Sequence, residues 1–327
     1  MFDTLNHYYL WVFILSRGIF NFSQITSLYY QAKSAPHIFS NYSIYSKVVL
    51  LISMVCIEIV FGLNSHNIYL PFLFESLMLL FSFSGIKFRR SSFEDFVNYT
   101  PRLLKASIPL ILSSIMVQIN VRSDILILEK IGTKFDLELY SAIARIILPA
   151  FFFPRVIGTL AYPHMIDTYN CNDDRYKEFL MDILSFSSFV SILLLSISIF
   201  LGPFFIDLLF SSNQDAMYSL FITLSVSWIF IMKGPILGRA LIIQNCSNHE
   251  AFKTVAGAFI NVGLNVYLIP LFGAGGAAIA TIISYAFSEF FYYSLFPSTR
   301  LLFKVTLYSV IPRPNRVIAG FKVITRS

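Results

Sequence analysis

The chain has 327 residues, of which 56% are hydrophobic and only 13% are charged, and its formal net charge is +6. Soluble domains carry about 25% charged residues, so this composition argues against an ordinary soluble domain and indicates a membrane protein. A basic balance in a soluble protein would favour nucleic acid, but here membrane topology explains it, and we expect no nucleic-acid partner. The three cysteines, Cys56, Cys171 and Cys246, are far apart and form no metal or redox motif.

Nine apolar stretches qualify as membrane-spanning helices, since a span takes about 20 residues. The expected fold class is therefore all-α, as a polytopic integral membrane protein with about nine spans and no soluble domain. The first span is interrupted by Arg17, and the third opens with Pro71. The expected spans are 8–30, 41–62, 67–86, 103–128, 139–165, 179–201, 216–239, 251–270 and 275–297.

The lysines and arginines predict the orientation. Sixteen of them fall in loops on one side, including the C-terminal stretch, whereas the opposite loops hold only Lys130 and Lys134. Cytoplasmic loops carry the excess of Lys and Arg, so we expect the C-terminus in the cytoplasm. With nine spans, the N-terminus is then expected outside.

The last two expected spans carry small residues at helical spacing. Small residues let membrane helices approach closely, and asparagine side chains hydrogen-bond between them. We therefore predict a tightly packed helix pair that breaks at Pro270 and turns through Gly273. The packing positions are Gly257, Asn261 and Asn265 on the first helix and Gly276, Ala280, Ser284 and Ser288 on the second.

Ten charged residues fall inside or near the ends of the expected spans. A charge at the bilayer centre costs at least about 2.5–3.5 kcal/mol on insertion scales, so buried examples face a cavity or a partner. Residues near span ends, such as Glu58, Arg239 and Glu289, are expected to reach the headgroups instead. The ten are Arg17, Glu58, Glu75, Arg122, Asp124, Arg145, Arg155, Lys233, Arg239 and Glu289.

Arg122 and Asp124 lie deep inside the stretch IMVQINVRSDILIL. Residues two positions apart are separated by about 200° around a helix, so the side chains of Arg122 and Asp124 point to different sides. Arg122 shares its side with Gln118, and Asp124 shares the other with Asn120. We expect one side to face a cavity and the other a neighbouring helix.

Three further basic residues extend this pattern. Arg145 and Arg155 are about 80° apart on one continuous helix, which is compatible with a single wet face. Lys233 precedes Gly234 and Pro235, where we expect a kinked or broken helix. The excess of cationic residues favours an anionic substrate, since arginine binds phosphate bidentately.

Two long runs stand out, LLKASIPLILSSIMVQINVRSDILIL and LYSAIARIILPAFFFPRVIGTLAYPHM, together with the link YYQAKSAPHIFSNYSIYSKVVLL. They resemble segments of a known family, the Wzx-type polysaccharide flippases of the multidrug/oligosaccharidyl-lipid/polysaccharide exporter superfamily. The resemblance covers about residues 25–295. It rests on Gln31, Lys47, Pro109, Arg122, Asp124, Tyr140, Ser141, Arg145, Pro154, Pro163, Asn261, Asn265, Pro270, Gly273, Gly276, Ala277, Ala278, Ala280 and Thr281.

The resemblance implies a two-lobed transporter with twelve helices, of which this chain carries numbers four to twelve. Residues 1–100 would be the remainder of the N-terminal lobe with a linker, 101–298 the C-terminal lobe, and 299–327 a basic cytoplasmic tail. The resemblance therefore leaves the first three helices of the family without a counterpart in the given sequence.

The implied activity is alternating-access transport of an undecaprenyl-diphosphate-linked oligosaccharide, such as an O-antigen unit, across the bacterial inner membrane. The expected partners are this lipid-linked oligosaccharide, the bilayer and other polysaccharide-assembly membrane proteins. No cofactor or metal is expected beyond H⁺ or Na⁺ coupling. The candidates for coupling are Asp124, Glu58 and Glu75, and those for substrate binding are Gln118, Arg122, Asp124, Arg145, Arg155 and Lys233.

Two alternatives remain open at this stage. A multidrug or cation antiporter of the same superfamily would share the fold, although cationic drugs favour an acidic cavity. A membrane polysaccharide polymerase or glycosyltransferase is the alternative from another class. We expect no enzyme, because the connections are short and the five histidines form no cluster.

Overall fold

The computed structural model describes residues 7–32, 36–62, 67–86 and 93–326, and within these ranges every regular element is a helix. The chain divides into two compact units, Met1–Phe96 and Val97–Ser327, each of which is described by itself. The boundary falls inside helix α4 (Phe93–Ile131). The expected all-helical membrane fold is confirmed.

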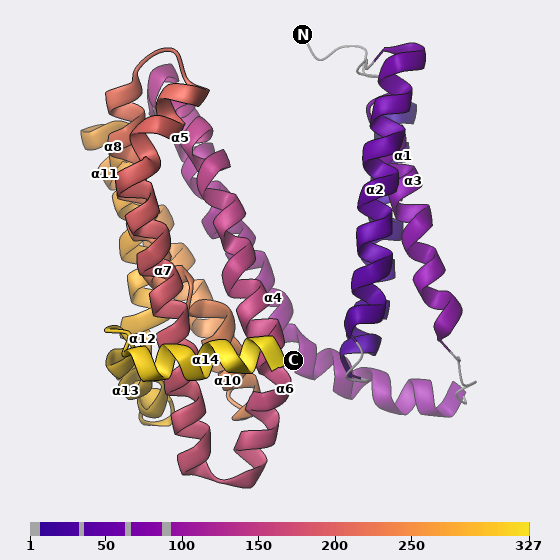
Figure 1. The fold of residues 1–327 in the computed structure, drawn as a ribbon, viewed down its shortest axis with the longest axis vertical. Helices are drawn as coiled ribbons and strands as arrows, with labels where there is room; N and C mark the ends of the chain where they lie inside the picture. Colours follow the sequence, from indigo (N-terminus) through magenta and orange to yellow (C-terminus); the bar gives the residue numbers. More distant parts are fainter. Residues whose placement is uncertain (1–6, 33–35, 63–66, 87–92, 327) are drawn as a thin grey trace. The chain divides into compact units, whose positions relative to one another are not determined.

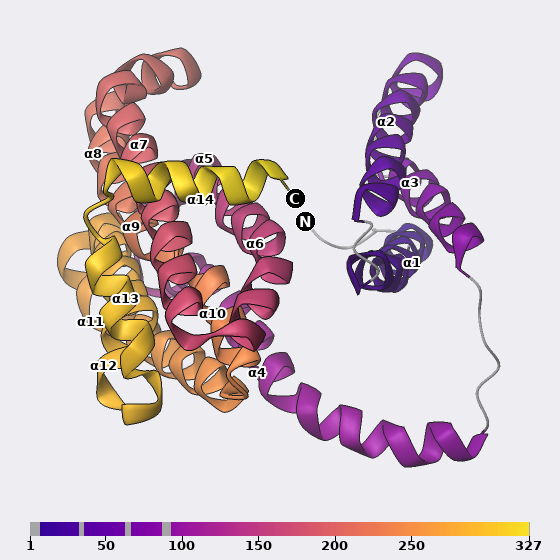
Figure 2. The same cartoon turned by 60° about the horizontal axis from the view of Figure 1, so that its bottom comes forward.

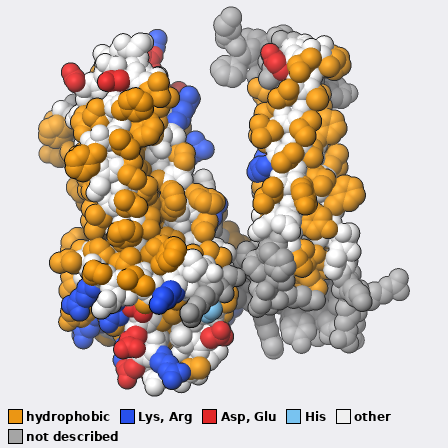
Figure 3. Space-filling model, viewed as in Figure 1, with side chains coloured by type: hydrophobic (Ala, Val, Ile, Leu, Met, Phe, Trp, Pro, Cys, Tyr) orange, Lys and Arg blue, Asp and Glu red, His pale blue; other side chains and the backbone are white. Residues whose placement is uncertain are grey.

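The described part of unit 1 consists of α1 (His7–Ala32), α2 (Pro36–Phe61), α3 (Leu70–Leu80) with the 3₁₀ turn η1 (Phe81–Gly85) that continues it, and the start of α4 (Figure 1). Helix α3 packs against both α1 and α2. Apolar side chains cover the visible face of this unit, as expected for a surface that contacts lipid (Figure 3).

Unit 2 is a bundle of long helices that lie side by side (Figures 1 and 2). Helix α4 is followed by α5 (Lys134–Ile147), the 3₁₀ turn η2 (Leu148–Phe151) and α6 (Phe152–Cys171). The long α7 (Asp173–Leu209) comes next. The remaining span-forming elements are α8 (Gln214–Val226), α9 (Trp228–Ile231), α10 (Gly234–Ile243), α11 (Ser247–Ala286), the π-helical segment η3 (Phe287–Phe291) and α12 (Tyr292–Leu295).

Six of the described helical stretches are long and apolar enough to cross a membrane. The last of them, Ser247–Leu295, contains two expected spans in succession. The third expected span is shorter than predicted and occupies Leu70–Gly85, and the first, in α1, is not among the six. The nine expected spans therefore all coincide with helices. Two of them, in α1 and in Leu70–Gly85, are not among the stretches that are long and apolar enough to cross a membrane.

The helix pair at the end of unit 2 turns at Gly273, as predicted, but lacks the predicted break at Pro270. The prediction of a break at Pro270 is wrong, because the helix continues through Pro270 and reverses at Gly273, where φ is 55° and ψ is −133°. Only glycine adopts that conformation without strain. Asp136 fixes the turn, because its Oδ1 accepts a hydrogen bond of 2.9 Å from the Ala274 amide. Proline is tolerated within membrane helices, where neighbouring groups compensate for the missing donor.

The C-terminal stretch is folded. It forms η4 (Pro297–Thr299), α13 (Arg300–Ser309) and α14 (Pro314–Arg326), and α14 crosses α7 in Figures 1 and 2. Arg316 forms an ion pair of 2.8 Å with Asp182 of α7. The predicted basic tail is therefore a pair of helices attached to unit 2.

Two buried apolar clusters hold unit 2 together. One lies where α5, α8 and α11 meet around Ile143, Met232 and Ala277. The other joins α6, α7 and α10 through Met165, Leu180 and Leu237. All of these side chains are fully buried. The polar groups described next lie among these packed helices and take their positions from them.

Candidate functional site

The carboxylate of Asp124 lies at the centre of a buried hydrogen-bond network in unit 2. Its Oδ2 accepts hydrogen bonds from the Tyr140 hydroxyl and, at 2.8 Å, from the Thr281 hydroxyl. Its Oδ1 accepts one of 2.6 Å from the Asn265 amide. Only 3% of the Asp124 residue is exposed. Three polar residues from α5 and from both halves of α11 thus converge on one carboxylate of α4.

The two asparagines bond toward α4 as well as along their own helix. Asn265 donates to Asn261 Oδ1 at 3.0 Å, and the Ser123 hydroxyl donates to the same oxygen at 2.6 Å. The predicted role of asparagines in interhelical bonding is therefore seen, and their partner helix is α4. The turn at Gly273 makes this possible, because it returns Thr281 to the same carboxylate.

Several polar atoms near Asp124 could still form hydrogen bonds or bind an ion. Among the residues that the structure describes, no side chain or backbone group hydrogen-bonds to the buried side-chain oxygens of Asn120 and Asn265 or to the buried amide nitrogen of Asn261. No ion pair joins Asp124 to a basic residue within the described part of the chain. A buried carboxylate without a cation, beside oxygens that could act as ligands, is a chemical environment suited to a small cation.

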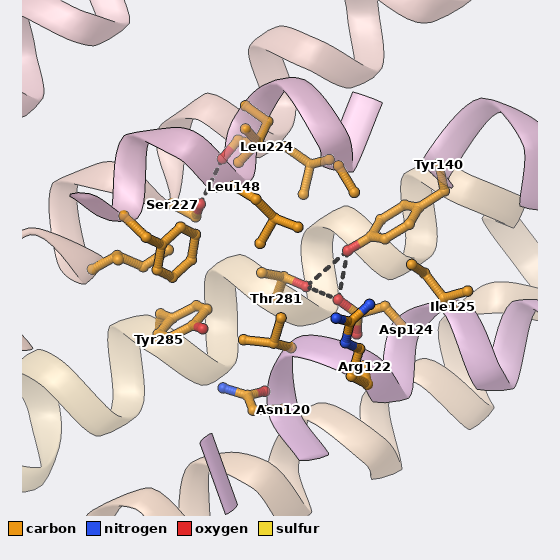
Figure 4. Close-up of a pocket in the computed structure, with 15 residues that line it drawn as sticks. Asn120, Arg122, Asp124, Ile125, Tyr140, Leu148, Leu224, Ser227, Thr281 and Tyr285 are labelled. Atoms are coloured by element: carbon orange, nitrogen blue, oxygen red, sulfur yellow. Dashed lines mark hydrogen bonds between the residues drawn. The ribbon is translucent and has the colours of Figure 1, made fainter. Parts of the chain in front are cut away.

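A small pocket of about 50 Å³ opens beside Asp124 (Figure 4). Arg122 and Asp124 both contribute to its lining, although Asp124 is buried and Arg122 is exposed. Asn120 also lines it, as its shared face with Asp124 predicted. The other lining residues are Val121, Ile125, Tyr140, Ala144, Ile147, Leu148, Phe151, Leu224, Ser227, Ile231, Thr281 and Tyr285.

Other predicted substrate residues are not in this pocket. Gln118 and Arg145 are exposed and line neither of the two cavities between the membrane-spanning helices of unit 2. Arg145 and Arg122 have no acidic partner among the residues that the structure describes. Both guanidinium groups are therefore available to an anion.

The expected single wet face of Arg145 and Arg155 stays a prediction, because both are exposed but only Arg155 lines one of the two cavities between the spanning helices. The 3₁₀ turn η2, which begins beside Pro149, interrupts the helix between them. A 3₁₀ turn has 3.0 residues per turn instead of 3.6, so the angular relation calculated for a continuous α-helix no longer holds. Arg155 lines a separate cavity, described below.

Lys233 lies at the predicted helix break, between α9 and α10. Its ammonium group is buried, with 2% of the residue exposed, and it donates a hydrogen bond of 2.9 Å to the Ile229 carbonyl. It lines neither cavity between the spanning helices. The structure thus separates Lys233 from the other predicted substrate residues.

The two coupling candidates of unit 1 are in different environments. Glu75 is completely buried and forms ion pairs with Arg17, at 2.9 Å, and with Lys47. Glu58 is exposed on α2. Two cations already neutralise Glu75, so of the three candidates only Asp124 is a buried carboxylate without a described basic partner.

The helix-packing residues of the last two spans are all buried. A Cβ atom on Gly257 would lie 3.0 Å from the Ser288 Cβ and 3.6 Å from the Ser284 carbonyl oxygen. Gly276 lies directly against the Leu268 carbonyl. Ala280 and Ser284 are fully buried on the same stripe. These small residues thus lie at a contact between two closely spaced helices.

A second cavity of about 380 Å³ contains charges that the sequence reasoning assigned elsewhere. Lys253 is one of the sixteen basic residues expected in loops on the cytoplasmic side, and Glu289 is expected at the headgroups, but both are buried and paired. Lys253 Nζ lies 2.8 Å from both carboxylate oxygens of Glu289 and 3.3 Å from Glu250 Oε2. We call Glu250, Lys253 and Glu289 the Lys253 cluster. Both expectations are corrected, because the two helical segments face one another at this level and their charges pair across the contact.

A sequence signal for the Lys253 cluster was present. Glu250 and Lys253 are three residues apart and therefore share a helix face. Glycines at 234 and 238 occur on the same face of α10, and a Cβ atom at either would lie about 3 Å from a cluster carboxylate. The sequence alone did not reveal that these two faces meet.

No protein-family model matches the chain. Over 254 residues the chain is 25% identical to the capsular polysaccharide biosynthesis protein CapF of Staphylococcus aureus. That alignment covers 74% of this chain and 63% of CapF, so the match spans less than two thirds of its relative. The structure is similar to the lipid II flippase MurJ in its inward closed conformation, with a TM-score of 0.60, 16% identity and coverage of 98% of this chain and 70% of MurJ.

The two comparisons concern different properties. The likeness to MurJ shows the fold, that of a multi-pass membrane protein, and the likeness to CapF relates the sequence to polysaccharide biosynthesis. Together they support the resemblance found in the sequence, that of a polysaccharide flippase in the multidrug/oligosaccharidyl-lipid/polysaccharide exporter superfamily.

Proposed function

We propose that this chain functions in moving a lipid-linked oligosaccharide across the bacterial inner membrane, with a polyprenyl diphosphate such as undecaprenyl diphosphate as the lipid carrier. The observation that carries the proposal is the pair Arg122 and Arg145, which are exposed on membrane-spanning helices without an acidic partner among the described residues. An uncompensated cation at such a position is costly unless it faces water or an anion. Arginine binds phosphate through two parallel hydrogen bonds.

The test is a flipping assay in proteoliposomes that contain a fluorescent undecaprenyl-diphosphate oligosaccharide. We expect Arg122→Glu and Arg145→Glu each to lower the flipping rate about tenfold or more, as for loss of a charge-assisted hydrogen bond. Lys134→Glu is the matched control, because Lys134 is an exposed basic residue at the start of α5. Unchanged rates in both arginine variants would remove the phosphate role.

We also propose that Asp124 binds the cation that drives transport. The carboxylate, the hydroxyls of Tyr140 and Thr281 and the unpartnered oxygen of Asn265 are hard ligands for a small cation. A single carboxylate favours a monovalent ion such as Na⁺. Flipping by the unaltered chain should then depend on Na⁺, and Asp124→Asn should abolish that dependence. Flipping that is equally fast with and without Na⁺ would overturn this assignment.

The proposal also includes orientation, partners and the absence of catalysis. The C-terminus would lie in the cytoplasm beside other polysaccharide-assembly membrane proteins. With Thr325→Cys introduced into a variant without the three native cysteines, the new thiol should react with an impermeant maleimide only after the cells are permeabilised.

Glycosyl transfer by the purified chain would contradict a transporter and favour the membrane-enzyme alternative.

A further inference from the structure

The Lys253 cluster has one more negative than positive charge. Lys253 is 1% exposed and lies between Glu250 and Glu289, whose side chains are 16% and 11% exposed. Removing charges from water is costly unless each is paired, and one cation can neutralise only one carboxylate. The other basic residues of the cavity, Arg155 and Arg239, form no ion pair with either glutamate.

Arg239 is occupied elsewhere. Its guanidinium donates to the Pro235 carbonyl at 3.0 Å and to the Thr159 hydroxyl at 2.9 Å, and it lies over the Tyr162 ring. It therefore has little freedom to turn toward the glutamates. Arg155 lines the same cavity but is exposed and forms no ion pair with either glutamate. The other neighbours are tyrosines and His249, whose ring nitrogens bond to Tyr292 and Ser298. The charged and titratable neighbours are Arg155 of α6, Arg239 of α10, His249 and Tyr285 of α11, and Tyr292 and Tyr293 of α12.

Two features of the local structure distinguish the cluster from an ordinary structural ion pair. Glu250 is held less closely than Glu289: its Oε2 lies 3.3 Å from Lys253 Nζ without a hydrogen bond from any described residue, whereas both oxygens of Glu289 lie 2.8 Å from that nitrogen. Glu289 lies in the π-helical segment η3, and such segments occur frequently at functional sites. The 380 Å³ cavity borders both carboxylates and provides room for water to reach them.

From this charge imbalance, the longer pairing distance of Glu250 and the adjoining cavity, we propose that the Lys253 cluster binds one exchangeable proton, shared between Glu250 and Glu289 and reached through the cavity. The proton makes the cluster neutral, because two carboxylates that lie close together do not both remain ionised when only one cation is present. The site is separate from Asp124 and does not depend on the identity of the transported molecule.

The test is an infrared pH titration of the full chain, purified in detergent, which detects protonated carboxyl groups directly. The unaltered chain should show a protonated buried carboxyl at neutral pH that disappears as the pH rises. Glu250→Gln and Glu289→Gln should each abolish this signal, because Lys253 then has a single counter-charge. Glu138→Gln is the matched control, since Glu138 is exposed on α5, and should leave the signal intact.

Two further variants make the outcome decisive. Lys253→Met should increase the signal, because both carboxylates then lack a cation, and Lys253→Arg should leave it close to that of the unaltered chain. A signal that persists in both glutamine variants but disappears in Asp124→Asn would overturn the proposal and assign the proton to the other site. Absence of any titrating carboxyl in the unaltered chain would overturn it as well. Neither result requires flipping, so failure here is distinct from failure of the proposed transport.

Discussion

The two units each bury a cluster of charges, with opposite composition. In unit 1 a single carboxylate, Glu75, lies between two cations, Arg17 and Lys47. In unit 2 a single cation, Lys253, lies between two carboxylates. The cations of unit 1 are partly exposed, at 31% and 56%, so their surplus charge is hydrated. The carboxylates of unit 2 are only 16% and 11% exposed, so their surplus charge is poorly hydrated and favours the proton proposed above.

The comparison shows why long basic side chains and short acidic ones behave differently in a membrane. Arginine and lysine extend toward polar surroundings while their stems stay in apolar ones. Arg17 does so among the rings of Phe13, Phe20 and Phe72, where its charge also meets aromatic faces. Glutamate has too short a stem for this, so a buried glutamate must find its neutralising partner locally.

The largest effect is expected from Lys253→Met. It leaves two buried carboxylates without a cation, and breaking a buried pair costs about 3–5 kcal/mol. Denaturant titration in mixed micelles should show this loss in the free energy of unfolding. The additional change Glu289→Gln should restore part of it. Equal stability of Lys253→Met and the unaltered chain would show that the cluster is not buried as described.

Removal of Glu75 should have a smaller effect. In Glu75→Gln the two basic side chains lose their partner but can still reach water, so we expect a loss of about 1.5–3 kcal/mol, as for hydrogen bonds to a charged group. The same titration measures it. A loss larger than that of Lys253→Met would reverse the comparison between the two units.

Two glycine substitutions test how tightly the carboxylates of unit 2 are held. A Cβ on Gly238 would lie 3.0 Å from Glu250 Oε2, whereas a Cβ on Gly263 meets nothing within 4 Å. Gly263→Ala should therefore stabilise its helix by about 0.5–1 kcal/mol, the usual gain over glycine. Gly238→Ala should show no such gain, because the carboxylate cannot move away from Lys253. An equal gain in both variants would mean that Glu250 is free to shift.

The smallest effect on stability is expected from Asp124→Asn. The amide can still accept from Tyr140 and Thr281 and can donate to the unpartnered oxygen of Asn265 after that side chain rotates. We expect a change below about 1 kcal/mol, the net value of a typical hydrogen bond. A stability loss like that of Lys253→Met, measured in the same micelles, would show that the charge of Asp124 is structural.

Sequence reasoning located the helices because a bilayer imposes a length and a composition on every span. It also selected Asp124 and Asn120 as one face of α4, since helical spacing fixes which residues share a side. It failed at Pro270, where neighbouring helices override the local signal. The predicted break there is absent, because α11 continues through the proline, and the predicted turn at Gly273 alone reverses the chain.

The sequence by itself determined that this is a multi-span membrane protein with costly charges inside its spans, because hydropathy and charge are local properties of the chain. The tertiary structure alone decided which of those charges are paired. Glu250 and Lys253 come from the start of α11, and Glu289 comes from the π-helical segment 36 residues beyond Lys253. Their contact depends on how the two halves of α11 fold back at Gly273, and no local pattern encodes such a distance.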